Sequence, residues 1–312
     1  MATNNFRAFG IGAGANVTSQ SDYEALAALL TGFQSGKASS AQINKALRQS
    51  TTMANVLAQF ISDSASVDVL DNGTPAAILA NLKSAMTAIT SGRLLNIQTI
   101  TTSGTIIPTP GAKKWLIKIV GGGGGGGGVA ATSNSQQATA TGGECGWYAE
   151  LLLTNLAASY SCAIGAAGVG GAAGVNAGTA GGATSIANVI SAPGGQSGAG
   201  GAAQGSATSV VGTSTYTGAP TVSAGTLLFS IAPQRGDPQL ALGTGIGEQK
   251  GGSGGDSPFG RGGRGGGGGG TSAGGAGQGR GTGGGGASIA FSTQANKGGD
   301  GTAGMIMIEE YA

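Results

Sequence analysis

Eight consecutive glycines, residues 121–128, constrain the fold of this chain more than any other stretch. Each glycine loses much backbone freedom on folding and has no side chain to bury, so the run cannot form an ordinary helix or a packed strand. Glycine does allow backbones to approach one another very closely. The preceding segment, 113–120, is rich in aliphatic and β-branched residues and predicts a β-strand that leads into the run.

The glycines divide the chain into two parts. Of the 67 glycines among 312 residues, only eight precede residue 111. Such a composition is typical of disordered segments, but recurrent strand-like segments and a charged fraction of only 9% favour order. We therefore predict an α+β multidomain protein, with a short helical bundle in residues 1–92 and a glycine-rich all-β domain in residues 93–312.

Residues 1–92 carry helical patterns. Capping signals and apolar spacing predict four helices, which start near Ser21, Ser39, Met53 and Ala76. The third helix carries an apolar stripe made by Met53, Val56, Leu57, Phe60 and Ile61. A bundle of this size is marginal by itself, so self-association is also expected. The fourth helix either joins copies of the chain or packs within it.

The first 18 residues have two interpretations. Phe6, Phe9 and Ile11 stand between small residues and three spaced glycines. This pattern fits an extended arm that docks on another surface, and it equally fits a disordered terminus.

Residues 93–312 alternate short apolar segments with glycine-rich connections. Strands are expected at 94–99, 101–107, 113–120, 147–153, 160–164, 183–190, 227–231, 287–291 and 305–311, with a polar loop over 132–141. This spacing predicts a sandwich- or barrel-like domain. Glycine recurs at every third residue from Gly165 to Gly174, which is the period of a polyglycine-II-like helix. Such segments either pack as rods that satisfy one another's backbone groups or serve as flexible linkers.

The residues that enzymes use most are missing or scattered. Histidine is absent, which removes the commonest general base and metal ligand. Cys145 and Cys162 form no metal or redox motif and are expected to be free, partly buried thiols. Residues 251–255 fit the GxSxG pattern without a preceding strand or a base, and 251–256 fit only half of a calcium-binding nonapeptide. We predict no enzymatic activity, catalytic residue, cofactor or metal.

Charge gives little reason to expect nucleic acid or a membrane as partner. The net charge is +2. Arg261 and Arg264 lie in an RGG-like segment, but no aromatic residue stands between them. No apolar run reaches 18 residues and the first residues lack the pattern of a signal peptide, so synthesis in the cytosol is expected.

The candidate contact residues lie in the two longest stretches without a predicted strand, 191–226 and 232–286. Connections of this length in an ordered domain are usually functional or disordered. Aromatic side chains provide contact area at low entropic cost, for sugars as for proteins. We predict a receptor-binding surface that includes Tyr216, Gln234, Arg235 and Phe259. The alternative is that these side chains fill small satellite hydrophobic clusters.

Several segments resemble a known family. Residues 103–128, 142–153 and 304–312 resemble the glycine-rich C-terminal domain of tailed-bacteriophage tail-fibre proteins. Residues 43–63 resemble the helical N-terminal region of tail fibres from phages and prophages of Gram-negative bacteria. The distal adhesins of T-even phages resemble the chain more remotely, through repeated glycine-rich motifs with variable loops between them.

The resemblance implies a homotrimeric virion protein of the phage tail, made in the host cytoplasm. Its N-terminal part would attach to the tail, the baseplate or another fibre protein. Its distal domain would recognise a bacterial surface receptor, either lipopolysaccharide or an outer-membrane protein. The chain lacks the long shaft of typical fibres, so it would be a short fibre or the tip of a longer assembly. The alternative is a purely structural tail or baseplate component.

Overall fold

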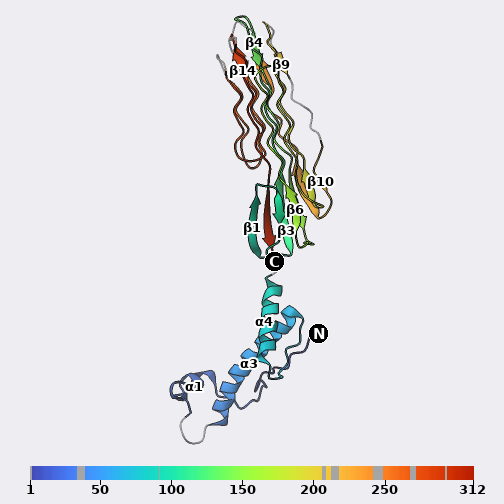
Figure 1. The fold of residues 1–312 in the computed structure, drawn as a ribbon. Helices are drawn as coiled ribbons and strands as arrows, with labels where there is room; N and C mark the ends of the chain where they lie inside the picture. The colour runs from blue at the N-terminus through green and yellow to red at the C-terminus, as the bar shows by residue number, and fades with distance from the viewer. Residues whose placement is uncertain are drawn as a thin grey trace. The chain divides into compact units, whose positions relative to one another are not determined.

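A computed structural model describes residues 2–33, 39–90, 92–205, 209–211, 218–241, 249–267, 272–291 and 294–312. The chain divides into two compact units, Met1–Ser91 and Gly92–Ala312 (Figure 1). The first unit is helical and the second is built from mostly antiparallel sheets and glycine-rich segments. No helix within the described ranges is long and apolar enough to cross a membrane.

The helices of the first unit differ from the predicted ones in their bounds and lengths. They are α1 (Gln20–Glu24), α2 (Ala28–Thr31), α3 (Ser40–Ala65) and α4 (Pro75–Ile89). The first predicted helix is split in two, and its cap is Ser19 rather than Ser21, since the Ser19 hydroxyl accepts the Asp22 N–H. The second and third predicted helices form one continuous helix, α3, because no glycine or proline interrupts residues 40–65.

A small core joins α3 to α4. Ala58 and Ile61 of α3 pack with Val69 and with Ala85 of α4, and Ile78 and Leu82 of α4 line the edge of this cluster. The rest of the predicted stripe on α3 does not enter the core: the side chains that stay 36–69% exposed are Met53, Val56, Leu57 and Phe60. On α4, Met86 and Ile89 are exposed as well. The helical unit therefore buries only part of its apolar surface.

The N-terminal segment docks on its own unit. Asn4 forms a parallel bridge with Val69, and Asn5 N–H donates to the Val69 carbonyl (3.0 Å). The Asn4 side chain donates to the Asn55 carbonyl of α3 (3.2 Å), and Phe6 packs against the α3–α4 core. Residues 3–6 are therefore ordered, but they dock on their own unit rather than on another surface, and Phe9 and Ile11 are exposed.

Two five-stranded antiparallel sheets pack face to face at one end of the glycine-rich unit (Figure 1). The first, here called the terminal sheet, has the order β1 (Leu94–Ile100), β15 (Met305–Tyr311), β3 (Lys114–Val120), β5 (Tyr148–Leu153), β11 (Thr226–Ile231). The second has the order β10 (Thr221–Val222), β8 (Ile190–Ala192), β7 (Thr184–Ile186), β6 (Tyr160–Ala163), β2 (Gly104–Ile106).

Alternation along the strands explains this packing. Trp115, Ile117 and Ile119 of β3 are completely buried, and the residues between them are more exposed. They meet Ile186 and Ile190 of the second sheet in one hydrophobic core. The predicted strand over 183–190 is interrupted because Asn188 has a positive φ of 58° and turns the chain from β7 into β8. The sheets form no closed barrel in the parts of the chain that the structure describes.

Two smaller sheets lie at the other end of the unit (Figure 1). One has the order β13 (Gln249–Lys250), β12 (Gln239–Ala241), β9 (Ser209–Val211), and the other pairs β14 (Ser288–Ala290) with β4 (Gln137–Thr139). The prediction of a loop over 132–141 is therefore wrong at β4, which is completely buried despite its polar residues. The sequence pattern did not indicate β4 because only its central residue, Ala138, is apolar. The strand pairs with β14, and Ala138 packs with Ile289 of that strand in a small hydrophobic cluster.

Between the two ends, the glycine run lies at the centre of a bundle of backbones. The N–H groups of Gly121, Gly124 and Gly127 donate to three carbonyls of the neighbouring segment 141–147, at 2.9–3.0 Å. The next glycine in each triplet donates to segment 176–182, and the third donates to segment 296–302. Each neighbour is thus contacted once in every three residues. This is the period that the glycine spacing predicts for packed rods.

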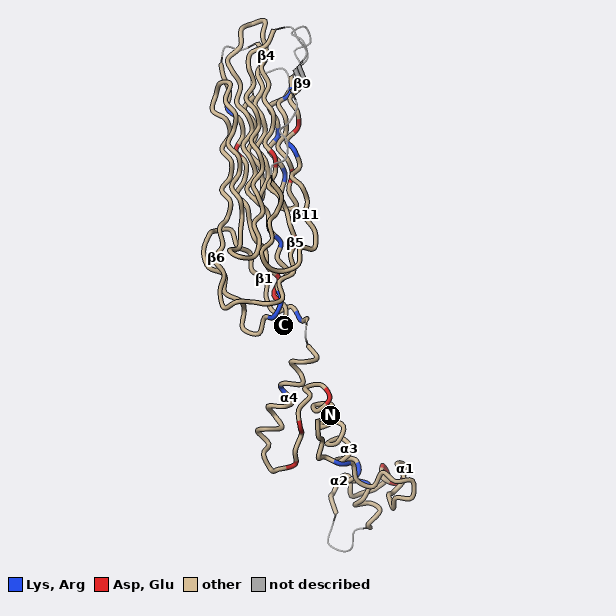
Figure 2. Tube along the Cα trace, turned by 90° about the vertical axis from the view of Figure 1, so that its right-hand side faces the viewer, with Lys and Arg blue, Asp and Glu red and all other residues tan. Residues whose placement is uncertain are grey.

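The carbonyl groups of the run follow the same rule. They accept N–H groups from three further segments at 2.8–3.0 Å, namely 168–174, 195–201 and 284–287. The central rod, residues 121–128, therefore has its backbone bonded to six surrounding segments, and every N–H of the run has a partner. Charged side chains are sparse along this bundle (Figure 2), and none occurs from residue 151 to residue 234.

Candidate binding site beside strand β11

The structure brings two of the four predicted contact residues to one cavity of about 220 Å³ in the glycine-rich unit. Its lining consists of Cys145, Gly146, Tyr148, Ile231, Ala232, Gln234, Asp256, Ser257 and Pro258. Gln234 is thus part of the wall. Phe259 lies next to it, because its ring packs edge-on against the ring of Tyr148 with centroids 5.7 Å apart. We call this cavity the Tyr148 cavity.

The other two predicted residues are placed differently. Arg235 follows Gln234 and is exposed, but it does not belong to the cavity wall. Tyr216 lies outside the described residues. Phe259 also fits the alternative interpretation, since it is partly buried against a small cluster formed by Val120, Tyr148 and Met305.

An aromatic cluster forms one wall of the site. Tyr148 is buried between two rings, Phe259 on one side and Phe229 of β11 on another, with the Phe229 centroid at 5.8 Å. The Tyr148 hydroxyl donates to Glu150 (2.5 Å). Burial, and then this bond to Glu150, raise the pKa of Tyr148 far above its ordinary value, so the phenol stays neutral. The two ring contacts and the bond to Glu150 fix the Tyr148 ring in position. The Phe229 ring is partly exposed to solvent.

The polar groups of the cavity largely bond to one another. Gln234 Oε1 accepts the Asp256 N–H (3.1 Å), and the Gln234 N–H donates to Cys145 Sγ (3.0 Å). Asp256 Oδ1 accepts the Gly262 N–H (2.6 Å), and the Ser257 hydroxyl donates to the Arg280 carbonyl. These bonds tie residues 234, 256 and 257 of the cavity wall to one another and to neighbouring segments.

The cysteines are free, as predicted, but more deeply buried than expected. Cys145 and Cys162 form no disulfide and are both buried. Burial raises the pKa of the Cys145 thiol to about 11, so it is protonated at neutral pH and is not a reactive nucleophile. In the described parts of the chain, no three His, Cys, Asp or Glu side chains gather in a way that could hold a metal ion.

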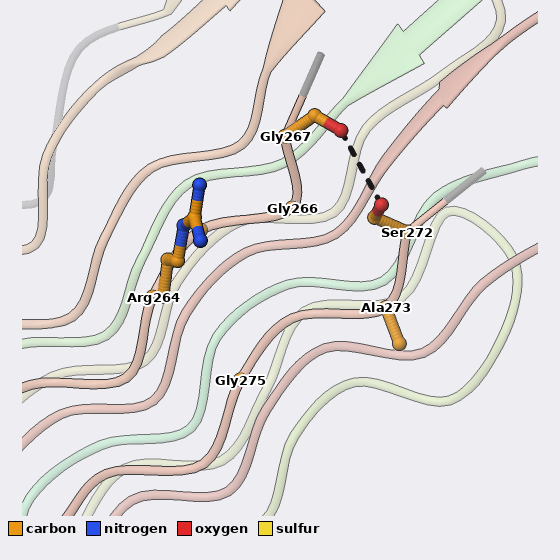
Figure 3. Close-up of a pocket in the computed structure, with 7 residues that line it drawn as sticks. Arg264, Gly266, Gly267, Ser272, Ala273 and Gly275 are labelled. Atoms are coloured by element: carbon orange, nitrogen blue, oxygen red, sulfur yellow. Dashed lines mark hydrogen bonds between the residues drawn. The ribbon is translucent and has the colours of Figure 1, made fainter. Parts of the chain in front are cut away.

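A larger opening, of about 480 Å³, lies in another part of the bundle. It is lined mostly by backbone, with Arg264 on one side and Ser272 on the other, as Figure 3 shows. The Ser272 hydroxyl donates to the Gly267 carbonyl (3.3 Å). A third cavity, of about 300 Å³, lies between Asp237 and Lys250. Neither contains a predicted contact residue, and neither has an aromatic wall.

Sequence reasoning missed the strand residues of the site. Tyr148, Phe229 and Ile231 stand in segments that the pattern identifies as strands, so they were expected to serve the core. One signal was present: residues 227–229 are three consecutive large apolar residues, without the alternation of a half-buried strand. All of β11 is exposed in the structure.

Comparison with known proteins gives the family of the chain. A family model described as a glycine-rich domain matches residues 99–311, which is more than half of the chain and spans almost all of the second unit. No curated protein matches the sequence. The chain therefore belongs to the glycine-rich domain family.

Proposed function

We propose that this chain is a tail-fibre protein of a tailed bacteriophage. Its helical unit attaches to the tail, the baseplate or another fibre protein, and its glycine-rich unit binds a receptor on the surface of a Gram-negative host. The protein acts by binding rather than by catalysis, and its place is the tail of the virion. The resemblance of residues 103–128 and 43–63 to tail fibres suggested this function, and the construction of the glycine-rich unit supports it.

The observation that carries the proposal is the backbone-bonded bundle. Because the central rod is surrounded by other backbones, the interior holds almost no side chains and recognises nothing. Side chains suited to recognition are restricted to the outer surface and to the connections between rods. A rigid scaffold of this kind holds such side chains in place before binding, so little affinity is lost in ordering them.

The Tyr148 cavity is a site of the right kind on this scaffold. It is concave, has an aromatic wall, and carries Gln234 and Asp256 on its polar side. The exposed ring of Phe229 adds rigid contact area beside it. A receptor contact here would be weak for a single copy, and several copies on one virion would add through effective concentration.

The exposed stripe of α3 supports self-association of the helical unit. Met53, Val56, Leu57 and Phe60 have the spacing of one helix face and are 36–69% exposed. We infer that copies of the chain pack together through this stripe as a homotrimer.

The paired substitution Met53→Glu and Phe60→Glu should convert the trimer to monomers, because it places charge in the apolar seam. Light scattering after gel filtration measures this directly. Leu30→Glu is the control, since Leu30 is 94% exposed on α2 and lies outside the stripe. A wild-type chain that is monomeric, or a doubly substituted chain that stays trimeric, would contradict the seam.

Adsorption to cells tests the proposed function. Fluorescently labelled full-length chain should bind Gram-negative cells of a suitable strain saturably, and an excess of unlabelled chain should compete. A panel of strains with intact or truncated lipopolysaccharide, and with or without the major porins, locates the receptor. If the folded, oligomeric chain binds no strain but binds purified tail or baseplate proteins, the adhesin function is wrong and a purely structural component is favoured.

A further inference from the structure

Strand β11 is an open and unusually apolar edge of the terminal sheet. Among the described residues it pairs only with β5, so its other edge carries backbone groups without a strand partner. Four of its six side chains are large, apolar and 39–50% exposed: Leu227, Leu228, Phe229 and Ile231. Proteins usually protect such an edge with charged residues or proline. Here the only irregularity is a shift of register between Leu227 and Phe229.

The Tyr148 cavity opens directly beside this edge. Ile231 belongs both to β11 and to the cavity wall. Phe229 lies on the same face of the sheet, because its ring contacts Tyr148, which also lines the cavity. In an extended peptide placed along β11, every second side chain would point to this face. One of them would reach the cavity while the peptide backbone bonded to the open edge.

The chemistry of the cavity favours an apolar side chain over a sugar. Gln234 Oε1, Asp256 Oδ1 and the Ser257 hydroxyl are already engaged within the protein. A saccharide needs several polar partners for its hydroxyl groups, and leaving them unpaired in a partly buried site is costly. A volume of about 220 Å³ next to Tyr148 and Ile231 suits a single large apolar side chain instead.

We propose that the edge of β11 and the Tyr148 cavity together bind an extended, apolar peptide segment of a host outer-membrane protein by strand addition. In this mode, main-chain hydrogen bonds supply affinity and pockets for alternate side chains supply specificity. The proposal rests on the proposed receptor-binding function and makes it narrower: the receptor is a protein, and the contact is a β-strand.

Two substitutions test the site in the full-length chain. Ala232→Phe fills the cavity from an exposed position, and Ile231→Gln removes apolar surface from the edge without adding charge. Ile97→Gln is the matched control, because Ile97 is 52% exposed on β1 at the opposite edge of the same sheet. Thermal unfolding of each variant shows whether the fold is kept.

The probe is a preparation of outer-membrane vesicles from a strain that adsorbs the chain, used before and after treatment with proteinase K, together with vesicles that have truncated lipopolysaccharide. We expect binding to fall about 10-fold or more after proteolysis and in A232F and I231Q. Binding should be kept in I97Q and with vesicles that have truncated lipopolysaccharide.

Binding that survives proteolysis and is lost with truncated lipopolysaccharide would overturn the peptide inference and leave the adhesin function standing. Protease-sensitive binding that A232F and I231Q do not weaken would overturn the site. Failure to bind any vesicle or cell would overturn the proposed function itself.

Discussion

Replacing Gly124 with alanine is expected to destabilise the glycine-rich unit by about 4 kcal/mol or more, or to prevent its folding. A Cβ atom at Gly124 would lie 2.0 Å from the carbonyl oxygen of Gln196, far inside van der Waals contact. The obstacle is backbone that is itself hydrogen-bonded on several sides, so it cannot move as a flexible side chain would. Chemical unfolding followed by circular dichroism and by tryptophan fluorescence measures the loss.

Gly104→Ala is the control for this substitution. Gly104 lies in β2, and a Cβ atom there would meet nothing within 4 Å. Its backbone has no positive φ that would strain alanine. The free energy of unfolding should change by about 0.5 kcal/mol or less. Equal tolerance of alanine at Gly124 and Gly104 would mean that the rods are not packed as described.

Replacing Glu310 with leucine is expected to cost about 3 kcal/mol. Glu310 is completely buried in β15, and its carboxylate accepts hydrogen bonds from Trp115 Nε1 (2.8 Å), the Thr109 N–H (3.0 Å) and Gln98 Nε2 (3.0 Å). The Thr109 hydroxyl and the Asn96 amide also donate to it. Leucine would leave the fully buried Trp115 N–H without a partner, which is the largest part of the expected loss.

Glu309→Gln provides the comparison for Glu310. Glu309 is the next residue, faces the opposite side of the strand, and pairs with Lys118 (2.6 Å) in a partly exposed position. A pair of that kind contributes about 1 kcal/mol or less. A loss at Glu310 no larger than the loss at Glu309 would contradict the role given to the buried carboxylate.

The acid dependence of stability should reveal the same carboxylate. Burial by itself would raise the pKa of Glu310, but the hydrogen bonds from Thr109, Gln98 and Trp115 outweigh it and hold this pKa below its ordinary value of 4.5. Between the folded and unfolded pKa values the unfolded chain binds more protons, so stability falls as the pH falls through that window. Unfolding curves from pH 7 to pH 3 should show this contribution in the wild type and lack it in Glu310→Leu. Parallel acid slopes for the two chains would argue against it.

Sequence could predict the strands and the rods because each leaves a local signal. Alternation from Trp115 to Ile119 indicates a strand, and glycine at every third residue from Gly165 to Gly174 indicates rods. The helical unit shows where such signals fail. The stripe of Met53, Leu57 and Phe60 indicates an apolar face correctly, but a pattern does not say whether the chain itself or another copy covers that face.

The candidate site was only half predictable for a related reason. Gln234 and Phe259 could be chosen because they stand in long connections, where polar and aromatic residues serve no strand. Tyr148 and Phe229 join them only through the order of strands, which places β11 beside β5 at the edge of the terminal sheet. That order depends on pairings between residues far apart in sequence, so no local pattern indicates it.

The central claim of this account is that the glycine run is an ordered, hydrogen-bonded rod. Hydrogen exchange of the full-length chain, read by mass spectrometry on peptides covering residues 121–128, tests it most directly. Every amide of the run donates to a neighbouring segment, so exchange should be about 100-fold or more slower than in the exposed residues 11–14 of the same molecule. Equal and rapid exchange in both segments would show that the glycines are flexible linkers and would contradict the account.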